Sequence, residues 1–407
     1  MLKHPITFED VVKAQKVIDG NVIKTLFEHS SSCSEWIGKS IYLKFENQQK
    51  TGSFKMRGAF NKMSHLTKDE LKKGVTACSA GNHAQGVALS ARLLGAPSFI
   101  VMPEIAPIAK IMATENYGAE VILHGSVFDE AYEYCLKLSK EKSYTLVHPY
   151  EDPYVIAGQG TIGLEIFEQI KDIDTFIIPI GGGGLIAGIA TVVKHLNPKA
   201  KIIGVVATRA PGMKRLVDSK GVLDTKYESK KTIADGIAIK KPSKMMYDTY
   251  ISKLVDEVVE ITDSEMAEAM VFLLERAKAV VEGAAGAALA AAKKYSHLLG
   301  EKNCVLLCGG NVDLNLIASI IDRGLEKTGR LWRASVLVED VPGVLNQLTQ
   351  EIANQGANIL EVEHKRLGKG IDIRQTRIDI LMGTKNVNHI QKIKEGLKAR
   401  GFDILDL

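Results

Sequence analysis

Short apolar runs alternate with amphipathic stretches between residues 70 and 210. The runs at 74–80 (GVTACSA) and 175–180 (TFIIPI) are apolar at nearly every position, which is typical of parallel strands covered by helices on both faces. Stretches with helical periodicity follow them, at 83–95 (HAQGVALSARLLG) and 185–196 (LIAGIATVVKHL). Strand–helix units repeated in this way predict an α/β layered fold.

The pattern changes beyond the polar segment 323–332, which we interpret as a linker. A strand, a helix, two alternating strands, a helix and a last strand are predicted across 333–407. This βαββαβ order is that of a ferredoxin-like unit. The unit is too small and too poor in nucleophiles for the main chemistry, which we therefore expect in residues 1–322.

Composition excludes several classes of partner. The 407 residues are 45% hydrophobic and 25% charged, with a net charge of only +4, which favours neither a nucleic-acid surface nor attraction to a membrane. No apolar run reaches the length of a membrane span, and the N-terminus lacks the apolar core of a signal peptide. The five cysteines are scattered without metal-binding spacing, which fits a reducing compartment. We therefore expect a cytoplasmic protein.

Four consecutive glycines, Gly181–Gly184, lie where a predicted strand runs into a helix. A glycine turn lets the backbone approach an anion, and the N–H groups at the start of the helix bind phosphate. The alternative is a flexible turn, but four glycines would be a costly way to make one. We therefore predict a phosphate site at this turn.

The same run also satisfies the dinucleotide pattern G-x-G-x-x-A, through Gly182, Gly184 and Ala187. The acidic residue expected after the next strand is missing, and Arg209 lies there instead. An arginine could accommodate a phosphorylated dinucleotide. A dinucleotide-dependent oxidoreductase is therefore an alternative.

A second strand-to-helix turn, CSAGNHAQG at 78–86, is rich in small and amide residues. Its hydroxyl, amide and N–H groups could hold a carboxylate at the start of a helix. The alternative is that Ser79 or Asn82 is simply the N-cap of that helix. His83 is more typical of a structural hydrogen-bond partner than of a catalytic base.

Two further side chains could carry chemistry. Lys55, in SFKMRGAF at 53–60, is either a solvated lysine at a helix end or an amine placed for a reaction. Cys308 ends an apolar strand before a glycine turn, where a cysteine is often only a small hydrophobic residue. Open parallel sheets bind ligands at the carboxyl ends of their strands. A phosphate site, a carboxylate site and a lysine there would suit an aldehyde cofactor with a phosphate tail, pyridoxal phosphate.

Several segments resemble the fold type II pyridoxal-phosphate enzymes, and within them the threonine/serine dehydratases, over roughly residues 5–320. They are SFKMRGA, SAGNHAQG, HPYEDPYVIAGQGT, GGGGL, TIADGIAI and VVEGAAGAALAA. The resemblance implies a catalytic domain at 1–322 with two layered α/β subdomains, the smaller one, at about 50–150, inserted in the larger. The tail, with EDVPGVLNQLTQEIANQGANI at 339–359, resembles an ACT regulatory domain.

The resemblance also implies roles for individual residues. Lys55 would bind the aldehyde of the cofactor, Phe54 would pack against its ring, and Glu282 would lie near the ring. Asn82 would reach the phenolic oxygen and Cys308 the pyridine nitrogen. The phosphate would be bound by Gly181, Gly182, Gly183, Gly184 and Leu185, and the substrate carboxylate by Ser79, Ala80, Gly81, Asn82 and His83.

The implied reaction is the deamination of L-threonine to 2-oxobutanoate and ammonia, and of L-serine to pyruvate, with Lys55 as the base that removes the α-proton. Burial would lower the pKa of Lys55, and a cation such as Arg57 would add to this effect if it were close. A neutral thiol at Cys308 would leave the ring a mild electron sink, which suits loss of a β-hydroxyl.

A serine racemase is the nearest alternative within the resembling enzymes. Those racemases carry a second hydroxyl at the position of Ala80, which would supply the acid on the opposite face. They also bind a divalent metal after the strand that here leads to Ala207 and Ala210, which supply no carboxylate. We therefore expect an elimination enzyme without that metal.

ACT units usually pair edge to edge and bind small effectors at the shared interface, so the resemblance implies a homo-oligomer, a dimer or a tetramer. The effector would be an amino acid such as isoleucine or valine, which would suit isoleucine biosynthesis, or a nucleotide. The residues expected around it are Asp340, Gly343, Val344 and Leu345 in the turn after the first strand, with Asn358 and Ile359 across the interface.

Overall fold

The computed structural model describes residues 5–224, 227–368 and 370–405. It divides into two compact units, Met1–Val312 and Asp313–Leu407. No helix in the described ranges is long and apolar enough to cross a membrane. The five cysteines all lie in these ranges, and each is buried with a free thiol.

The first unit is built around a six-stranded sheet. Its strands are β1 (Phe27–His29), β2 (Ser40–Lys44), β7 (Thr175–Pro179), β8 (Lys201–Ala207), β9 (Glu257–Ile261) and β10 (Lys302–Leu306), in the order β1-β2-β10-β7-β8-β9. Only β1 runs antiparallel to its neighbour, and the other pairs are parallel. Every position of β7 is buried, as expected of a strand covered on both faces.

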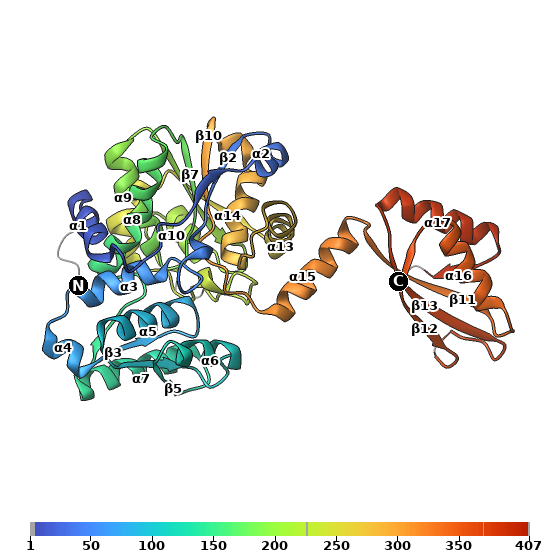
Figure 1. Cartoon of the computed structure of the whole chain (residues 1–407), viewed down its shortest axis with the longest axis horizontal. Helices are drawn as coiled ribbons and strands as arrows, with labels where there is room; N and C mark the ends of the chain where they lie inside the picture. Colours follow the sequence, from blue (N-terminus) through green and yellow to red (C-terminus); the bar gives the residue numbers. More distant parts are fainter. Residues whose placement is uncertain (1–4, 225–226, 369, 406–407) are drawn as a thin grey trace. The chain divides into compact units, whose positions relative to one another are not determined.

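A second sheet is entirely parallel. It contains β3 (Val75–Cys78), β4 (Ser98–Met102), β5 (Glu120–Leu123) and β6 (Thr145–Leu146), in the order β5-β4-β3-β6. Because side chains alternate across a strand, Val75 and Ala77 pack with helix α5 (Asn82–Leu94), whereas Cys78 packs with helix α7 (Phe128–Lys142). Figure 1 shows these helices on either side of β3. The predicted α/β layered fold is thus confirmed.

Helix α8 (Pro153–Gln169) holds two other helices in place. A Cβ atom on Gly158 of α8 would lie 2.6 Å from the Cα of Gly58 in α3 (Lys55–Ser64). A Cβ atom on Gly188 of α9 (Gly184–Leu196) would lie 2.6 Å from the nitrogen of Gly160 in α8. Since only glycines permit such approaches, the first turns of α3 and α9 are fixed relative to each other.

Further helices complete the first unit. They are α1 (Phe8–Ile18), α2 (Ser31–Ile37), α4 (Lys68–Lys73), α6 (Ile108–Asn116), α10 (Gly212–Asp218), α11 (Lys244–Met246), α12 (Ser252–Leu254), α13 (Asp263–Phe272) and α14 (Gly283–Lys294). Short turns of 3-10 or π type are η1 (Glu46–Gln48), η2 (Asp235–Ile237), η3 (Tyr247–Ile251), η4 (Leu273–Ala277) and η5 (Ser296–Leu298).

The second unit contains the βαββαβ order predicted from the sequence. Its elements are β11 (Leu331–Glu339), α16 (Val344–Asn354), β12 (Asn358–Lys365), β13 (Gln375–Gly383), α17 (Val387–Ala399) and β14 (Asp403–Leu405). The strands form an antiparallel sheet in the order β12-β13-β11-β14. Alternate residues of β11 and β13 pack against both helices, so this unit has a core of its own.

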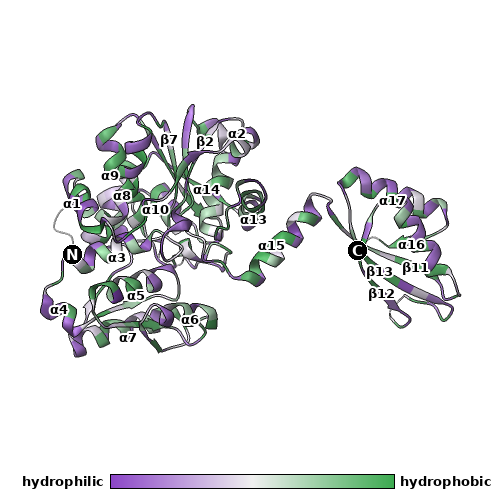
Figure 2. Ribbon diagram, in the orientation of Figure 1, coloured by the Kyte–Doolittle hydropathy of each residue, from purple (hydrophilic) through white to green (hydrophobic). Residues whose placement is uncertain are grey.

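The segment 323–332, expected to be a linker, is regular structure over much of its length. Helix α15 (Leu314–Lys327) runs into it from one side, and β11 starts at Leu331. Apolar residues recur along α15 at helical spacing, at Leu316, Ile317, Ile320 and Ile321. Figure 2 shows this mixture of apolar (green) and polar (purple) residues. The polar residues up to Lys327 that suggested a linker therefore belong to a helix, and only 328–330 lie between α15 and β11.

Candidate active site

Lys55 is the first residue of α3, and the segment before it is bound to the turn after β10. The N–H of Phe54 donates to the carbonyl oxygen of Cys308 (3.2 Å), and the N–H of Gly310 donates to the carbonyl oxygen of Gly52 (2.8 Å). Ser53 and Gly309 form an antiparallel bridge between these two bonds. Residues that lie about 250 positions apart in the sequence are thus brought together, with Lys55 beside Cys308.

The side chain of Lys55 is half-buried. Its Nζ donates a hydrogen bond to the carbonyl oxygen of Pro149 (3.1 Å). Burial lowers the pKa of Lys55 from 10.5 to about 8, while the nearby groups of Cys308 and Glu282 oppose that shift. The interpretation of Lys55 as a solvated surface lysine is therefore wrong, and its amine is available as a base at neutral pH.

Arg57 does not contribute to the lowered pKa of Lys55, contrary to the expectation from the sequence. Its guanidinium is fully buried and forms ion pairs with Glu46 (2.8 Å) and Glu165 (2.6 Å). Glu165 also pairs with the buried amine of Lys44 at 2.5 Å. Because two carboxylates and two cations balance within this cluster, Arg57 presents no free charge to Lys55.

The glycine turn has the geometry of an anion site. Helix α9 begins at Gly184, and Gly183 at its N-cap has a φ of +97° and no side-chain cap. A Cβ atom on Gly182 would lie only 2.2 Å from a ring carbon of Tyr150. The N–H groups of the first turn, which includes Leu185, are therefore left for a ligand that the backbone can approach closely.

The start of α5 offers a second set of N–H groups. Its N-cap is Gly81, which has no side-chain cap, and Asn82 is already the first helical residue. The hydroxyl of Ser79 accepts only from the N–H of Gly81 (3.2 Å). The alternative in which Ser79 or Asn82 caps the helix is thus wrong. The uncapped turn, with the methyl group of Ala80 beside it, can take a carboxylate.

The side chain of His83 is bound to the backbone of another segment. Its Nε2 lies 2.7 Å from the carbonyl oxygen of Val147, to which it donates. Burial lowers the pKa of His83 to about 3, so the ring stays neutral. Its side chain is a structural hydrogen-bond partner, as expected, and only its backbone lies in the carboxylate turn.

The side chains of Asn82 and Glu282 are hydrogen-bonded to each other. The side-chain nitrogen of Asn82 lies 3.0 and 2.9 Å from the two carboxylate oxygens of Glu282. Burial raises the pKa of Glu282 to about 7, and the hydrogen bond from Asn82 opposes that rise. The N–H of Glu282 donates to the carbonyl oxygen of Gly309 (3.0 Å), which fixes the start of α14 against the Cys308 turn.

The thiol of Cys308 is neutral in this site. Burial raises its pKa well above the ordinary value, and the adjacent Glu282 raises it further. A neutral thiol can accept or donate a weak hydrogen bond but cannot force a ring nitrogen to be protonated. This agrees with its expected position beside a pyridine nitrogen.

Sequence reasoning missed several residues of the site. Asn311 donates to the side-chain oxygen of Asn82 (2.8 Å) and to the carbonyl oxygen of Thr51 (2.7 Å). Tyr150 covers the glycine turn, and Pro149 accepts from Lys55. The segment HPYEDP was quoted for the resemblance, and Asn311 follows the glycines after Cys308, so an amide just after that turn was a usable signal. The placement of Tyr150 had no local signal.

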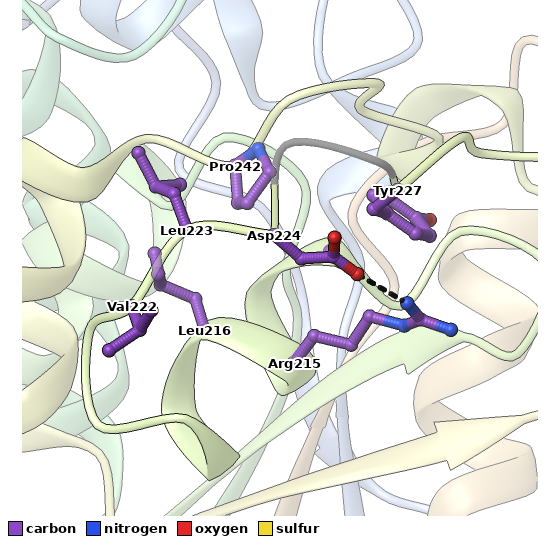
Figure 3. A pocket seen from close by; sticks show the side chains of 8 residues that line it. Arg215, Leu216, Val222, Leu223, Asp224, Tyr227 and Pro242 are labelled. Atoms are coloured by element: carbon purple, nitrogen blue, oxygen red, sulfur yellow. Dashed lines mark hydrogen bonds and ion pairs between the residues drawn. The ribbon is translucent and has the colours of Figure 1, made fainter.

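A separate hollow lies beside α10. Figure 3 shows Arg215 there, paired with Asp224 at 3.0 Å and lying over the ring of Tyr227. It is lined by Gly212, Arg215, Leu216, Val222, Leu223, Asp224, Tyr227 and Pro242. None of these residues belongs to the predicted site, so the hollow is not part of it.

The site as a whole fits one cofactor class. A lysine amine with a lowered pKa, a glycine turn at an uncapped helix, a neutral thiol and an amide together suit an aldehyde with a ring nitrogen and a phosphate. The model of the pyridoxal-phosphate dependent enzymes matches residues 18–310. The chain belongs to this family and is a pyridoxal-phosphate dependent enzyme, which leaves the dinucleotide pattern of the glycine run without support.

Three relatives show where the chain lies within this family. The L-threonine ammonia-lyase of Thermotoga maritima is 45% identical over 98% of this chain and 99% of its own. Maize serine racemase has a TM-score of 0.73 and 33% identity, over 80% of this chain and 99% of that one. Threonine deaminase isoform 2 of Solanum lycopersicum has a TM-score of 0.72 and 34% identity, over 78% of this chain and 89% of that one. The predicted fold type II architecture of the first unit is thus supported.

Proposed function

We propose that the protein deaminates L-threonine to 2-oxobutanoate and ammonia, and L-serine to pyruvate, by elimination of the β-hydroxyl. The observation that carries the proposal is the Lys55 amine, with a lowered pKa, in a unit that also has two helix starts without side-chain caps, at α5 and α9. The L-threonine ammonia-lyase that is 45% identical over nearly the whole chain supports the substrate class.

Lys55 has two tasks in this proposal: it carries the cofactor's aldehyde, and once displaced it removes the α-proton of the substrate. Because its pKa is about 8, roughly one amine in ten is neutral at pH 7, against about one in 2,500 for an ordinary lysine. When bound, pyridoxal phosphate withdraws electrons from the α-carbon of the amino acid. Phe54, the residue before Lys55, is buried, and in this proposal it packs against the ring of the cofactor.

The other residues orient cofactor and substrate. Gly181–Leu185 bind the phosphate, and Cys308 meets the pyridine nitrogen as a neutral thiol. Asn82, held by Glu282, binds the phenolic oxygen. The turn of Ser79, Ala80, Gly81, Asn82 and His83 takes the substrate carboxylate through its hydroxyl and N–H groups.

Elimination rather than racemisation follows from Ala80. Racemisation needs a second acid on the face of the α-carbon opposite Lys55. The carboxylate turn offers a methyl group there, and the nearby imidazole of His83 is held by Val147. The fold alone does not separate the two activities, because maize serine racemase is also similar in structure.

Keto-acid formation from L-threonine, L-serine and D-serine tests the proposal. We expect product from both L-amino acids and little from D-serine. Threonine and serine differ by one methyl group, so a preference of about 10- to 200-fold either way is compatible with the site. A dominant activity on D-serine, or release of D-serine from L-serine, would refute it.

We also infer that the second unit is an ACT domain that regulates the enzyme in the cytoplasm, as part of isoleucine biosynthesis. Helix α16 starts after Gly343, which has a φ of +92° and no side-chain cap. The turn before it is held by Asp340, which pairs with Arg366 (2.8 Å). The N–H of Val344 donates to the carbonyl oxygen of Val341 (3.4 Å), but that of Leu345 in the same turn is suited to the carboxylate of an amino-acid effector.

The edge strand β12 supports pairing between copies. It bonds only β13 among the described strands, and it exposes Leu360 and Val362. An exposed edge with apolar side chains readily pairs with another strand. Such pairing would place Asn358 and Ile359 of one copy near the effector turn of another, in a dimer or tetramer.

Isoleucine, valine and a nucleotide, added separately to the full chain, test this regulation. We expect one of them to change the activity at subsaturating threonine, and Asn358→Ala to weaken that response. Val387→Ala, at an exposed position of α17, is the control and should respond normally. If none of the ligands changes the activity or the size of the oligomer, the regulatory proposal fails.

A further inference from the structure

The loop between β6 and α8 touches both ends of the proposed cofactor site. The carbonyl oxygen of Pro149 accepts the hydrogen bond of the Lys55 amine (3.1 Å). The next residue, Tyr150, lies against the glycine turn so closely that a Cβ atom on Gly184 would be 2.9 Å from its Cα. A shift of this loop would therefore move the partner of Lys55 and the wall of the phosphate site together.

The shape of the loop depends on His148. Its Nδ1 accepts hydrogen bonds from two successive N–H groups, those of Tyr150 (3.3 Å) and Glu151 (2.9 Å). A ring nitrogen can accept only when it carries no proton. The imidazole must therefore be neutral with its proton on Nε2, which faces the carboxylate of Glu151 at 3.8 Å.

We propose that His148 is a positioning residue for cofactor binding, whose unprotonated Nδ1 holds Pro149 and Tyr150 in place and whose protonation loosens the site. A proton on Nδ1 would replace two accepted hydrogen bonds by repulsion from two N–H groups. Because the loop contacts both ends of the site, the loss would show as weaker binding of pyridoxal phosphate. The inference rests on the proposed placement of the cofactor at Lys55 and Gly181–Gly184.

The surroundings of His148 set the pH range of this effect. Burial and the charge of Lys55 lower its pKa, while Glu151 and Asp152 on the loop raise it. From the neighbouring helices, the neutral His83 of α5 and the ring of Tyr132 of α7 also face it, and Tyr150 packs edge-on at 4.8 Å. The ring is therefore neutral at physiological pH and becomes charged only on the acid side.

Two substitutions of His148 test its hydrogen-bond acceptor and the packing of its ring separately. In His148→Asn the side-chain oxygen can accept from the N–H groups that follow, as asparagine does in turns, but it cannot titrate. In His148→Phe the ring still packs against Tyr132 and Tyr150, but the acceptor is lost. His65→Phe is a matched control, because that ring stacks on Tyr154 and meets only a carbonyl oxygen.

The measurement is the dissociation constant of pyridoxal phosphate, from titration of the cofactor-free full chain across the acid range. Far-UV circular dichroism checks the fold of each variant. We expect His148→Phe to weaken binding about tenfold or more, since two hydrogen bonds are lost, and His65→Phe to bind normally. Toward acid pH the wild type should lose affinity relative to His148→Asn. The ratio of their two dissociation constants isolates His148, because Lys55 and the cofactor phosphate titrate in both proteins.

The inference is wrong if folded His148→Phe binds the cofactor as tightly as the wild type. It is also wrong if His148→Asn and the wild type lose affinity in parallel as the pH falls, and this second test stands even if His148→Phe does not fold. Either result would leave the proposed deamination intact, because wild-type keto-acid formation is measured separately.

Discussion

The side-chain nitrogen of Asn82 lies within 3.0 Å of both carboxylate oxygens of Glu282, a residue 200 positions further along the chain. The oxygen of the same amide accepts from Asn311 (2.8 Å). Both polar atoms of the Asn82 side chain thus have a partner, and because the two oxygens of one carboxylate can share a single N–H, the second N–H can serve a ligand. Since Asn82 is proposed to meet the phenolic oxygen of the cofactor, we infer that Glu282 and Asn311 set the orientation of its amide.

Replacing Glu282 by glutamine should change how stability depends on pH. The pKa of Glu282 rises from 4.5 to about 7 on folding, because the carboxyl is buried. Between these pH values the folded protein keeps a proton that the unfolded chain loses, so stability falls as the pH rises from about 4.5 to about 7. Glu282→Gln cannot ionise, so its melting temperature without cofactor should rise relative to that of the wild type between about pH 4.5 and about pH 7.

Thermal unfolding of the cofactor-free proteins at several pH values checks this prediction. Glu28→Gln, at an exposed position of β1, is the control and should follow the wild type. If the curves of Glu282→Gln and the wild type stay parallel, Glu282 does not titrate in the way described.

Lys55→Met should stabilise the cofactor-free protein while removing its activity. The pKa of Lys55 falls from 10.5 to about 8 on folding, so below about pH 8 the folded protein carries a desolvated charge. Stability lost to that charge returns only as the pH rises from about 8 to about 10.5. We therefore expect a higher melting temperature at neutral pH, and keto-acid formation at least about a hundredfold lower because the base is gone.

The exposed Lys50, five positions before Lys55, supplies the control. Lys50→Met should change neither melting temperature nor activity. A Lys55→Met variant that keeps its activity, or that melts below the wild type at neutral pH, would contradict the assignment of Lys55.

Gly182→Ala should weaken cofactor binding. The added Cβ atom would lie 2.2 Å from a ring carbon of Tyr150, so the turn or the ring must move away from the phosphate position. We expect the dissociation constant of pyridoxal phosphate to rise about tenfold or more, corresponding to about 1.4 kcal/mol. Gly383→Ala, where the nearest atom to the new Cβ is 3.8 Å away, is the control. Equal affinity in both variants would exclude the glycine turn as the phosphate site.

Arg57→Leu should destabilise the first unit strongly. The substitution leaves the buried carboxylates of Glu46 and Glu165 with Lys44 as their remaining cation in the cluster. Removing one partner from a buried ion cluster costs about 3–5 kcal/mol. Denaturant unfolding should show that loss, whereas Lys244→Ala, which breaks an exposed pair with Asp248, should change stability by less than about 1 kcal/mol. Small losses of similar size in both variants would contradict a structural role for the cluster.

Local pattern was sufficient for much of the fold. The apolar runs at β3 and β7 and the helical periodicity after them predicted parallel layers. The repeat of two residues in a strand and of 3.6 residues in a helix can be recognised from neighbouring positions alone. The βαββαβ order of the second unit was predicted for the same reason. The helical structure of 323–327 at the end of the expected linker was not predicted, because polar residues dominate the composition of that segment.

The sequence by itself determined which turns carry the candidate chemistry, since Lys55, the turn at 79–83 and Gly181–Gly184 all adjoin predicted strand or helix ends. Only the tertiary structure decided how their charges are used. Arg57 is neutralised by Glu46 and Glu165, Asn82 is held by Glu282, and His148 shapes the loop over Lys55. Two of these contacts, Arg57–Glu165 and Asn82–Glu282, join residues 108 and 200 positions apart. The pKa of a buried group depends on such neighbours as well as on its local sequence.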